Sequence, residues 1–291
     1  MGDDLAGLYL AEINRAYPGC IVFLLDQSFS MKDPFAGNTA VRKANAAADA
    51  INKLLMDLVI RSTQNFGEGP RDYFDIGVIG YGARTGVGPC FGGSLKGREL
   101  VSISELAANL LRVEQRARTV SNEEGVHNTT VRFPVWFDPV AEGGTPMAEA
   151  MQVARKILEP WVAAHRKSSP PIVINITDGE PGSSPVKAAG ALTALASDDG
   201  DVLLYNIHLS RLALTPITFP SSSANLPDKY ATMLFDISSQ VPPQIREELS
   251  VEGYPTDPGA RGFVFNADAG ALLQFLDIGT RLAMGGVASD R

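Results

Sequence analysis

Two short apolar runs constrain the fold of this chain more than any other feature. The first is Ile21–Leu25 and the second is Ile172–Ile176. Runs of this length and composition are typical of buried β-strands. Each leads into an aspartate, Asp26 after the first and Asp178 after the second. The chain therefore places carboxylates where two buried strands give way to loops.

Strand-like and helix-like segments alternate through most of the chain, which is the pattern of a doubly wound parallel sheet. We predict an α/β fold with a mostly parallel central sheet flanked by helices. The expected strands lie at 21–25, 73–81, 172–177, 201–209 and 262–266. The expected helices lie at 39–63, 103–113, 146–166, 185–197 and 268–284. Glycines at 86, 88, 92 and 93 predict a tight hairpin or an antiparallel edge strand.

The length of 291 residues allows one large α/β domain or two small ones, and we favour one. We divide the chain into an N-terminal extension at 1–17 and a single domain at 18–291. Residues 114–144 are interpreted as a loop with a short extended segment. Residues 211–260 are rich in proline and serine and predict an ordered insertion, with short helices at 228–239 and 244–250.

Charge and targeting signals narrow the class of protein. With 25 basic and 33 acidic residues the net charge is -8, which argues against binding to nucleic acid or to an anionic membrane. No signal peptide and no apolar run of about 20 residues is found, so we expect a cytoplasmic protein. Cys20 and Cys90 are expected to be two reduced thiols, since two distant cysteines make no disulfide framework.

The residues after the first strand have the chemistry of a metal site. Asp26, Ser28 and Ser30 form an Asp-x-Ser-x-Ser motif, and such hard oxygen ligands suit Mg²⁺ or Mn²⁺. Two further segments, Gly143-Gly144-Thr145-Pro146 and the strand that ends in Asp178-Gly179, complete a pattern. The chain resembles the von Willebrand factor A (vWA) domains, whose metal-ion-dependent adhesion site (MIDAS) is built from Asp-x-Ser-x-Ser, a Thr and a later Asp.

The resemblance implies a ligand set of Asp26, Ser28, Ser30, Thr145 and Asp178, with Asp178 often acting through water. Because parallel strands point their carboxyl ends at one edge of a sheet, the loops after residues 25 and 177 are expected to meet there. Hydroxyl ligands are neutral, so the bound cation keeps positive charge and can attract a carboxylate from outside.

The residues around the motif are candidates for a rim that contacts a partner. Phe29 stands where many soluble bacterial vWA proteins have glycine, and it is either an apolar partner contact or a local packing residue. Asp33 and Glu180 adjoin the metal loops and are either rim residues or ordinary solvated charges.

The function expected from the resemblance is a metal-dependent protein-interaction module, an adaptor without catalysis. A partner protein would present an Asp or Glu to the metal. The motifs resemble those of small cytosolic bacterial members, including tellurium-resistance-associated proteins, which implies a stress-response or defence system and a kinase, phosphatase or MoxR-type ATPase as partner.

The alternative is a metal-dependent hydrolase or phosphatase-like enzyme. Its proton-shuttling group would have to be Glu180 or Glu142. A haloacid-dehalogenase phosphatase would need a second Asp where Ser28 stands. The glycines from Gly80 to Gly86 imitate a dinucleotide-binding fingerprint, but the spacing is off by one and no helical pattern follows. The three histidines lack metal or triad spacing.

Overall fold

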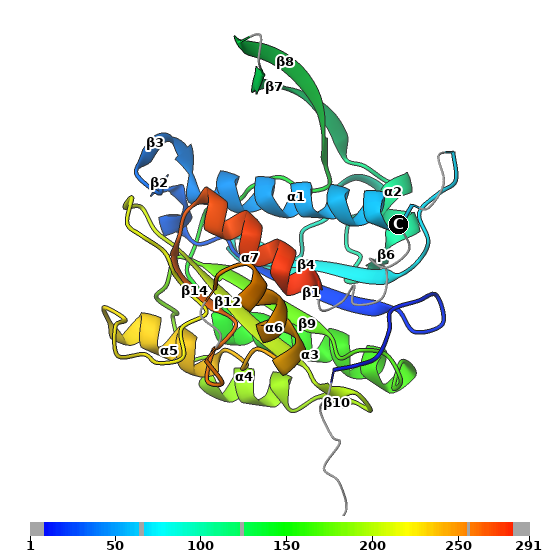
Figure 1. Ribbon diagram of the computed structural model, residues 1–291, viewed down its shortest axis with the longest axis vertical. Coiled ribbons are helices and arrows are strands. Elements are labelled where there is room, and N and C mark those ends of the chain that lie inside the picture. Colours follow the sequence, from blue (N-terminus) through cyan, green and yellow to red (C-terminus); the bar gives the residue numbers. More distant parts are fainter. Residues whose placement is uncertain (1–8, 64–66, 123–124, 255–256, 282–291) are drawn as a thin grey trace, which may run out of the picture.

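The computed structural model describes residues 9–63, 67–122, 125–254 and 257–281. Its centre is an eight-stranded sheet in the order β13-β14-β12-β9-β1-β4-β5, with β6 also paired to β4 (Figure 1). The parallel strands are β1 (Gly19–Asp26), β4 (Phe74–Ala83), β9 (Ile172–Thr177), β12 (Leu203–Leu209) and β14 (Phe263–Ala267). The strands β5 (Gly86–Pro89), β6 (Val101–Ser102) and β13 (Ile217–Thr218) pair antiparallel at its two sides. The predicted fold class is confirmed, including the antiparallel edge.

The order of the parallel strands creates a crevice beside β1. If the five parallel strands are numbered in chain order, their order across the sheet is 2-1-3-4-5. From β1 the chain therefore passes first to β4 on one side and then to β9 on the other. Such a reversal opens a crevice at the carboxyl ends of the two strands that flank it, here β1 and β9. Asp26 ends β1 and Asp178 follows β9.

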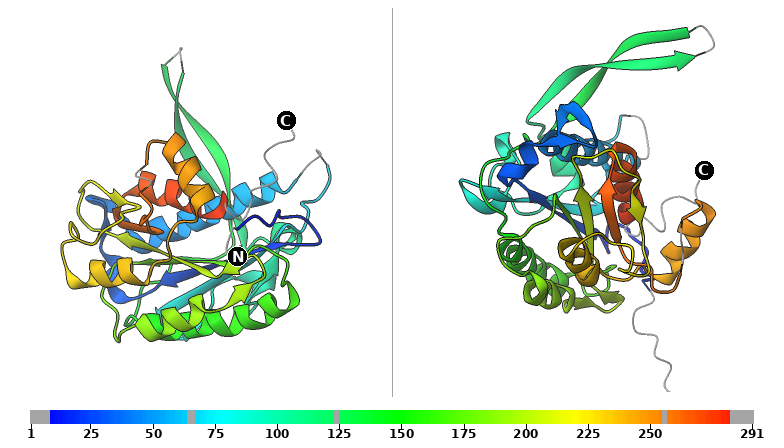
Figure 2. Two further views of the ribbon diagram at one scale, coloured as in Figure 1. Left: turned by 60° about the horizontal axis from the view of Figure 1, so that its bottom comes forward. Right: turned by 90° about the vertical axis from the view of Figure 1, so that its left-hand side faces the viewer.

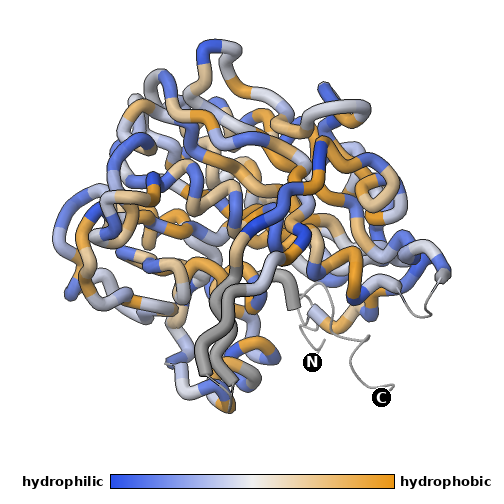
Figure 3. The backbone as a smooth tube through the Cα atoms, turned by 90° about the horizontal axis from the view of Figure 1, so that it is seen from above, coloured by the Kyte–Doolittle hydropathy of each residue, from blue (hydrophilic) through white to orange (hydrophobic). Residues whose placement is uncertain are grey.

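Strand β1 is buried along its whole length because helices cover both faces of the sheet (Figure 2). Ile21, Phe23 and Leu25 face one core, and Val22 and Leu24 face the other, as the two-residue period of a strand requires. Hydrophobic residues accordingly concentrate in the interior of the backbone trace, and hydrophilic residues in its outer loops (Figure 3).

Each face of the sheet has its own set of helices. The first core contains side chains from α1 (Lys43–Arg61), α2 (Ile103–Ala108), α6 (Pro243–Val251) and α7 (Ala269–Arg281). The second contains side chains from α3 (Met147–Ala164), α4 (Val186–Thr193) and α5 (Lys229–Ile237). Shorter elements are η1 (Phe29–Lys32), η2 (Gly93–Leu95) and the paired strands β2 (Pro34–Phe35) with β3 (Asn38–Arg42) and β10 (Ala196–Ser197) with β11 (Gly200–Asp201).

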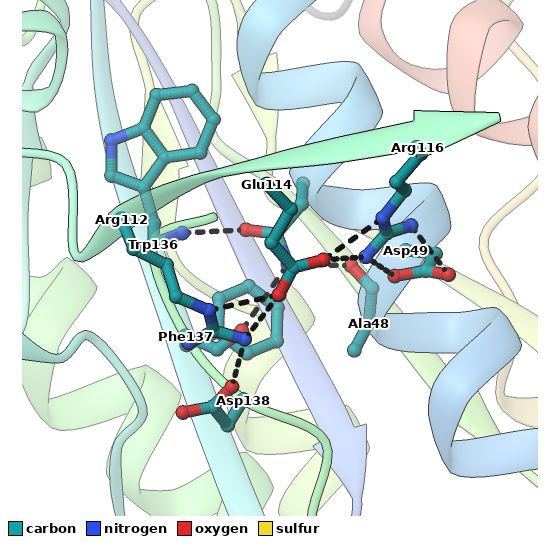
Figure 4. A network of polar contacts seen from close by, with 9 residues as sticks. Ala48, Asp49, Arg112, Glu114, Arg116, Trp136, Phe137 and Asp138 are labelled. Carbon is teal, nitrogen blue, oxygen red and sulfur yellow. Dashed lines mark hydrogen bonds and ion pairs between the residues drawn. The ribbon is translucent and has the colours of Figure 1, made fainter. Parts of the chain in front are cut away.

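A long hairpin projects from the body of the molecule (Figures 1 and 2). It consists of β7 (Arg112–Asn122) and β8 (Gly125–Val135), paired antiparallel from end to end. The prediction of a loop with a short extended segment at 114–144 was therefore wrong as far as Val135, and residues 136–142 form a loop. At the base of the hairpin, Arg116 binds Asp49 of α1 and Glu114 (Figure 4). Its guanidinium also lies 3.7 Å from the Phe133 ring centroid.

Three predicted helices differ from those in the structure at their ends. The helix expected at 185–197 ends at Thr193, because residues 196–197 form β10 and pair with β11. The helix expected from residue 39 begins at Lys43, because residues 38–42 form β3 and pair with β2. The helix expected at 103–113 ends at Ala108, and its N-cap is Ser102, whose hydroxyl accepts the Glu105 N–H. The predicted closing helix corresponds to α7, and its last residues, 282–284, lie outside the described part of the chain.

The segments outside the parallel sheet pack against it. Of the predicted extension at 1–17, residues 1–8 lie outside the described residues, and Ile13 is buried in the first core. In the 211–260 segment, α5 and α6 form at the two predicted places, and Phe219 and Leu234 are buried. Over the described ranges, no helix combines the length and the apolar character needed to cross a membrane.

Candidate metal centre

The crevice beside β1 gathers the side chains of the Asp-x-Ser-x-Ser motif. Asp26 is the last residue of β1, and its carboxylate is fully buried. Its Oδ1 accepts the backbone N–H of Ser28 at 2.8 Å, which folds the loop back on the strand end. Its Oδ2 accepts the Thr177 hydroxyl at 2.6 Å, which joins β1 to β9. The carboxylate is therefore held by both strands of the crevice.

Asp26 lies in an environment that disfavours its own charge. Burial raises the pKa of this carboxyl from 3.8 to about 6, although hydrogen bonds from Ser28 and Thr177 favour the charged form. The nearby carboxylate of Asp178 raises the pKa further. In the described residues, no Lys or Arg forms an ion pair with Asp26. A cation beside this carboxylate would relieve both unfavourable effects.

The two serines and Asp178 form one connected set of oxygens. The hydroxyls of Ser28 and Ser30 lie 3.1 Å apart, and the Ser30 hydroxyl donates to Oδ1 of Asp178 at 2.9 Å. Ser28 is buried and Ser30 is exposed, so the set leads from the sheet edge to the surface. The structure thus brings together four of the predicted ligands: Asp26, Ser28, Ser30 and Asp178.

Thr145, the fifth predicted ligand, belongs to a loop that is tied to the same crevice. Gly143 accepts the Phe29 N–H at 2.8 Å and donates its own N–H to the Gly82 carbonyl at 2.7 Å. The Thr145 carbonyl accepts the N–H of Gly182 at 2.9 Å, so the loop also contacts the segment after Asp178. Thr145 is partly buried beside the motif.

Close backbone contact at this loop depends on Gly82. Its φ is +100°, and a Cβ built there would lie 2.3 Å from the Gly144 carbonyl oxygen. Any other residue would strain the backbone and displace the loop that carries Thr145. The glycines from Gly80 to Gly86 therefore serve a strand end and a tight hairpin into β5, with no helix following.

The three residues predicted to form a rim come from two segments, with Phe29 and Asp33 at the two ends of η1 and Glu180 two residues after Asp178. Phe29 is 63% exposed, and the Lys32 ammonium lies 4.3 Å from its ring centroid. The Asp33 side chain is 46% exposed. Glu180 is exposed and accepts a hydrogen bond from the hydroxyl of Tyr230, in α5. The 211–260 segment therefore reaches the rim.

Three residues that the sequence analysis missed adjoin the site. Thr177 holds Asp26, and Lys43 forms an ion pair with Asp178 at 2.9 Å. His208 stacks on Phe265 and accepts the Asn266 N–H, and burial lowers the pKa of its imidazole to about 4. A signal existed for Lys43, since a basic residue at the first position of a helix opposes the helix dipole.

The donor set fits a hard divalent cation. It offers two carboxylates and the hydroxyls of Ser28 and Ser30, all oxygen, which suits Mg²⁺ or Mn²⁺. Across residues 9–63, 67–122, 125–254 and 257–281, no cluster of three or more His, Cys, Asp or Glu could hold a metal. A site here would therefore depend on hydroxyl ligands. Cys20 and Cys90 are free thiols, and the Gln27 side chain, between Asp26 and Ser28, donates to the Cys90 sulfur at 3.5 Å.

Comparison with known proteins adds a likeness of structure and none of sequence. No protein family model matches the chain, and no curated protein matches it in sequence. The chain is similar to a solved structure, the manganese-loaded TRAP protein of Plasmodium vivax, with 16% sequence identity and a TM-score of 0.42. The match covers 90% of this chain and 72% of that one. The fold assignment rests on the strand order and the helical layers described above.

Proposed function

We propose that this chain is a vWA-type interaction module that holds Mg²⁺ or Mn²⁺ with Asp26, Ser28, Ser30, Thr145 and Asp178. The observation that carries the proposal is the connected set of oxygens at the strand reversal: Ser28 to Ser30 at 3.1 Å and Ser30 to Asp178 at 2.9 Å. When bound, the cation would supply a positively charged coordination position for an acidic side chain of a partner protein.

The residues of the chain prepare that position. Asp26 is held by Ser28 and Thr177, so its carboxylate needs little rearrangement to face a cation. Two of the ligands are neutral serine hydroxyls, which leaves charge on the ion for a partner carboxylate. The exposed Phe29 ring beside the crevice suits an apolar side chain next to that carboxylate.

The hydrolase alternative has no observation in its favour. The carboxylate of Glu142 accepts the backbone N–H of Arg84 at 3.0 Å, and that of Glu180 is held by Tyr230. Both candidate proton shuttles are therefore engaged in structural contacts. The partner classes implied by the resemblance, a kinase, a phosphatase or a MoxR-type ATPase, stay predictions, as do the bacterial setting and the cytoplasmic location.

Titration calorimetry with Mn²⁺ tests the metal site. We expect one Mn²⁺ per chain, and we expect Asp26→Ala, or Ser28→Ala together with Ser30→Ala, to abolish binding while the circular dichroism spectrum is unchanged. A matched control is Ser221→Ala, which removes another serine-to-carboxylate hydrogen bond, at 3.1 Å from Asp257. Undiminished binding by the Asp26 and Ser28/Ser30 variants would refute the site.

Capture of a partner tests the second half of the proposal. Wild-type protein immobilised with Mg²⁺ should retain a partner that EDTA or Asp26→Ala releases. Phe29→Ala should weaken capture without changing Mn²⁺ affinity, because its ring contacts Lys32 and not the oxygen set. Capture that persists in EDTA would show recognition by another surface.

A further inference from the structure

Lys43 is a buried cation in a position that is doubly unfavourable. It is the first residue of α1, and its side chain is only 6% exposed. The N-terminus of a helix carries positive partial charge, so an ammonium group there is repelled, and no acidic residue in the first turn of α1 offsets it. Burial adds a desolvation cost. Such a lysine persists only where it has specific partners.

Its principal partner is the second carboxylate of the candidate metal centre. The Lys43 ammonium lies 2.9 Å from Oδ2 of Asp178, whose side chain is also 6% exposed, and 3.7 Å from the more exposed Asp33. The other oxygen of Asp178, Oδ1, accepts the Ser30 hydroxyl. Lys43 therefore orients Asp178 so that one oxygen faces the serines and the other faces the ammonium.

This contact changes the charge of the site. Asp26 and Asp178 together carry two negative charges when ionised, and Lys43 returns one positive charge. A divalent ion bound to the two carboxylates alone would give a neutral centre. With Lys43 present, the ion, the two buried carboxylates and the ammonium sum to one positive charge, and the half-exposed Asp33 carboxylate at 3.7 Å offsets that charge only in part because water screens it. The Lys43 ammonium therefore repels the metal ion and favours an anionic ligand on it.

We propose that Lys43 is a resident counter-cation of the metal centre. Its ammonium holds Asp178 in hydrogen-bonding position for Ser30 when no metal is bound. It also weakens metal binding and strengthens the binding of an acidic ligand to the bound metal. The inference rests on the proposed function and assigns Lys43 as a positioning residue. A purely structural lysine would stabilise the fold but leave metal affinity unchanged or, by supporting Asp178, raise it.

Removing the charge while keeping a hydrogen-bond donor tests the proposal. We expect Lys43→Gln to bind Mn²⁺ at least tenfold more tightly than wild type in titration calorimetry, because a neighbouring positive charge is lost. We also expect a lower melting temperature than wild type in EDTA and a larger rise in melting temperature on adding Mn²⁺. Lys43→Arg, which keeps the charge, should bind Mn²⁺ within about threefold of wild type.

Two controls separate this effect from general damage. Lys53→Gln removes another lysine of α1, which is exposed and paired with Asp57 at 2.8 Å, and should change nothing. Lys43→Met with Asp178→Asn removes both buried charges and should recover melting temperature in EDTA relative to Lys43→Met alone. If Lys43→Gln does not fold in EDTA, it is refolded in Mn²⁺ and its affinity measured by competition with a chelator.

The outcomes also separate this inference from the proposed function. Wild-type binding of Mn²⁺ with equal or weaker binding by Lys43→Gln overturns the role of Lys43 and leaves the metal site standing. Failure of Lys43→Gln to fold even in Mn²⁺ assigns Lys43 a structural role and overturns the inference. Absence of Mn²⁺ binding by wild type overturns both proposals.

Discussion

Replacing Asp26 by asparagine should stabilise the metal-free protein while it destroys the candidate metal site. Burial raises the pKa of the Asp26 carboxyl by about two pH units, from 3.8 to about 6. At about 1.4 kcal/mol per unit, the ionised carboxylate costs about 3 kcal/mol of folding free energy above pH 6. Asparagine has no charge to desolvate, and its carbonyl can still accept the Ser28 N–H. Losing the carboxylate oxygen that accepts the Thr177 hydroxyl costs about 1 kcal/mol, so the free energy of unfolding should rise by about 2 kcal/mol in all.

The sign of the pH dependence distinguishes this explanation from improved packing. Because the folded-state pKa lies above the unfolded value, the folded protein binds more protons between about pH 4 and pH 6, and Asp26 lowers stability as the pH rises through that window. His208 has the opposite effect, since its pKa is lowered to about 4 from 6.5 and stability rises as it loses its proton. Asp26→Asn loses the contribution of Asp26 and keeps that of His208, so the variant should gain stability from pH 4 to pH 7 more steeply than wild type does.

Urea denaturation in EDTA at pH 4.5 and pH 8 provides the measurement. The advantage of Asp26→Asn over wild type should be about 2 kcal/mol at pH 8 and should shrink toward zero at pH 4.5. Asp236→Asn, a change at an exposed aspartate, serves as control and should show no such difference. Adding Mn²⁺ should stabilise wild type alone. A variant no more stable than wild type at pH 8, or equally advantaged at both pH values, would refute the reasoning.

Three further changes test the surroundings of the site. Tyr81→Phe removes the hydroxyl that donates to Oδ1 of buried Asn175 at 2.7 Å, so the free energy of unfolding should fall by about 1–3 kcal/mol in a urea titration. Tyr17→Phe, at an exposed position, should leave the free energy of unfolding unchanged. Gly82→Ala should lower the free energy of unfolding by about 2 kcal/mol or more and weaken Mn²⁺ binding, because it displaces the Thr145 loop. Gly88→Ala, with no atom within 4 Å of the added Cβ, should do neither. Normal Mn²⁺ binding by Gly82→Ala would contradict the role of that contact. Arg116→Ala breaks partly exposed ion pairs with Asp49 and Glu114, so the free energy of global unfolding should change by less than about 1 kcal/mol. Limited proteolysis should nevertheless cut the hairpin faster in Arg116→Ala than in Arg132→Ala. Equal rates would show that other contacts hold the base of the hairpin.

The sequence by itself determined the parts of this protein that depend on local pattern. Strand β9 lies at the predicted residues because every residue of Ile172–Thr177 except Asn175 is β-branched, and α5 and α6 form in the two windows that proline leaves free. The placement of Asp26 and Asp178 at one sheet edge also follows from the sequence, since it requires only that two buried strands run parallel. The hairpin β7–β8 carried a readable signal as well, in the β-branched residues on both sides of Gly125. Its charged residues obscured that signal, because they interrupt the regular apolar alternation that identifies a half-buried strand.

Only the tertiary structure decided which charges surround the site. Lys43 is distant from Asp178 in sequence, and α1 must cross the sheet at one angle for its first residue to reach that carboxylate at 2.9 Å. Long-range packing likewise brings the Thr177 hydroxyl to Asp26 and the Tyr230 hydroxyl to Glu180. It also places His208 beside Asp178. Burial sets the pKa of Asp26, and burial is a property of the packed sheet and not of the motif. Spacing in the sequence identifies candidate ligands, but the electrostatic environment that decides what they bind arises only when distant elements pack together.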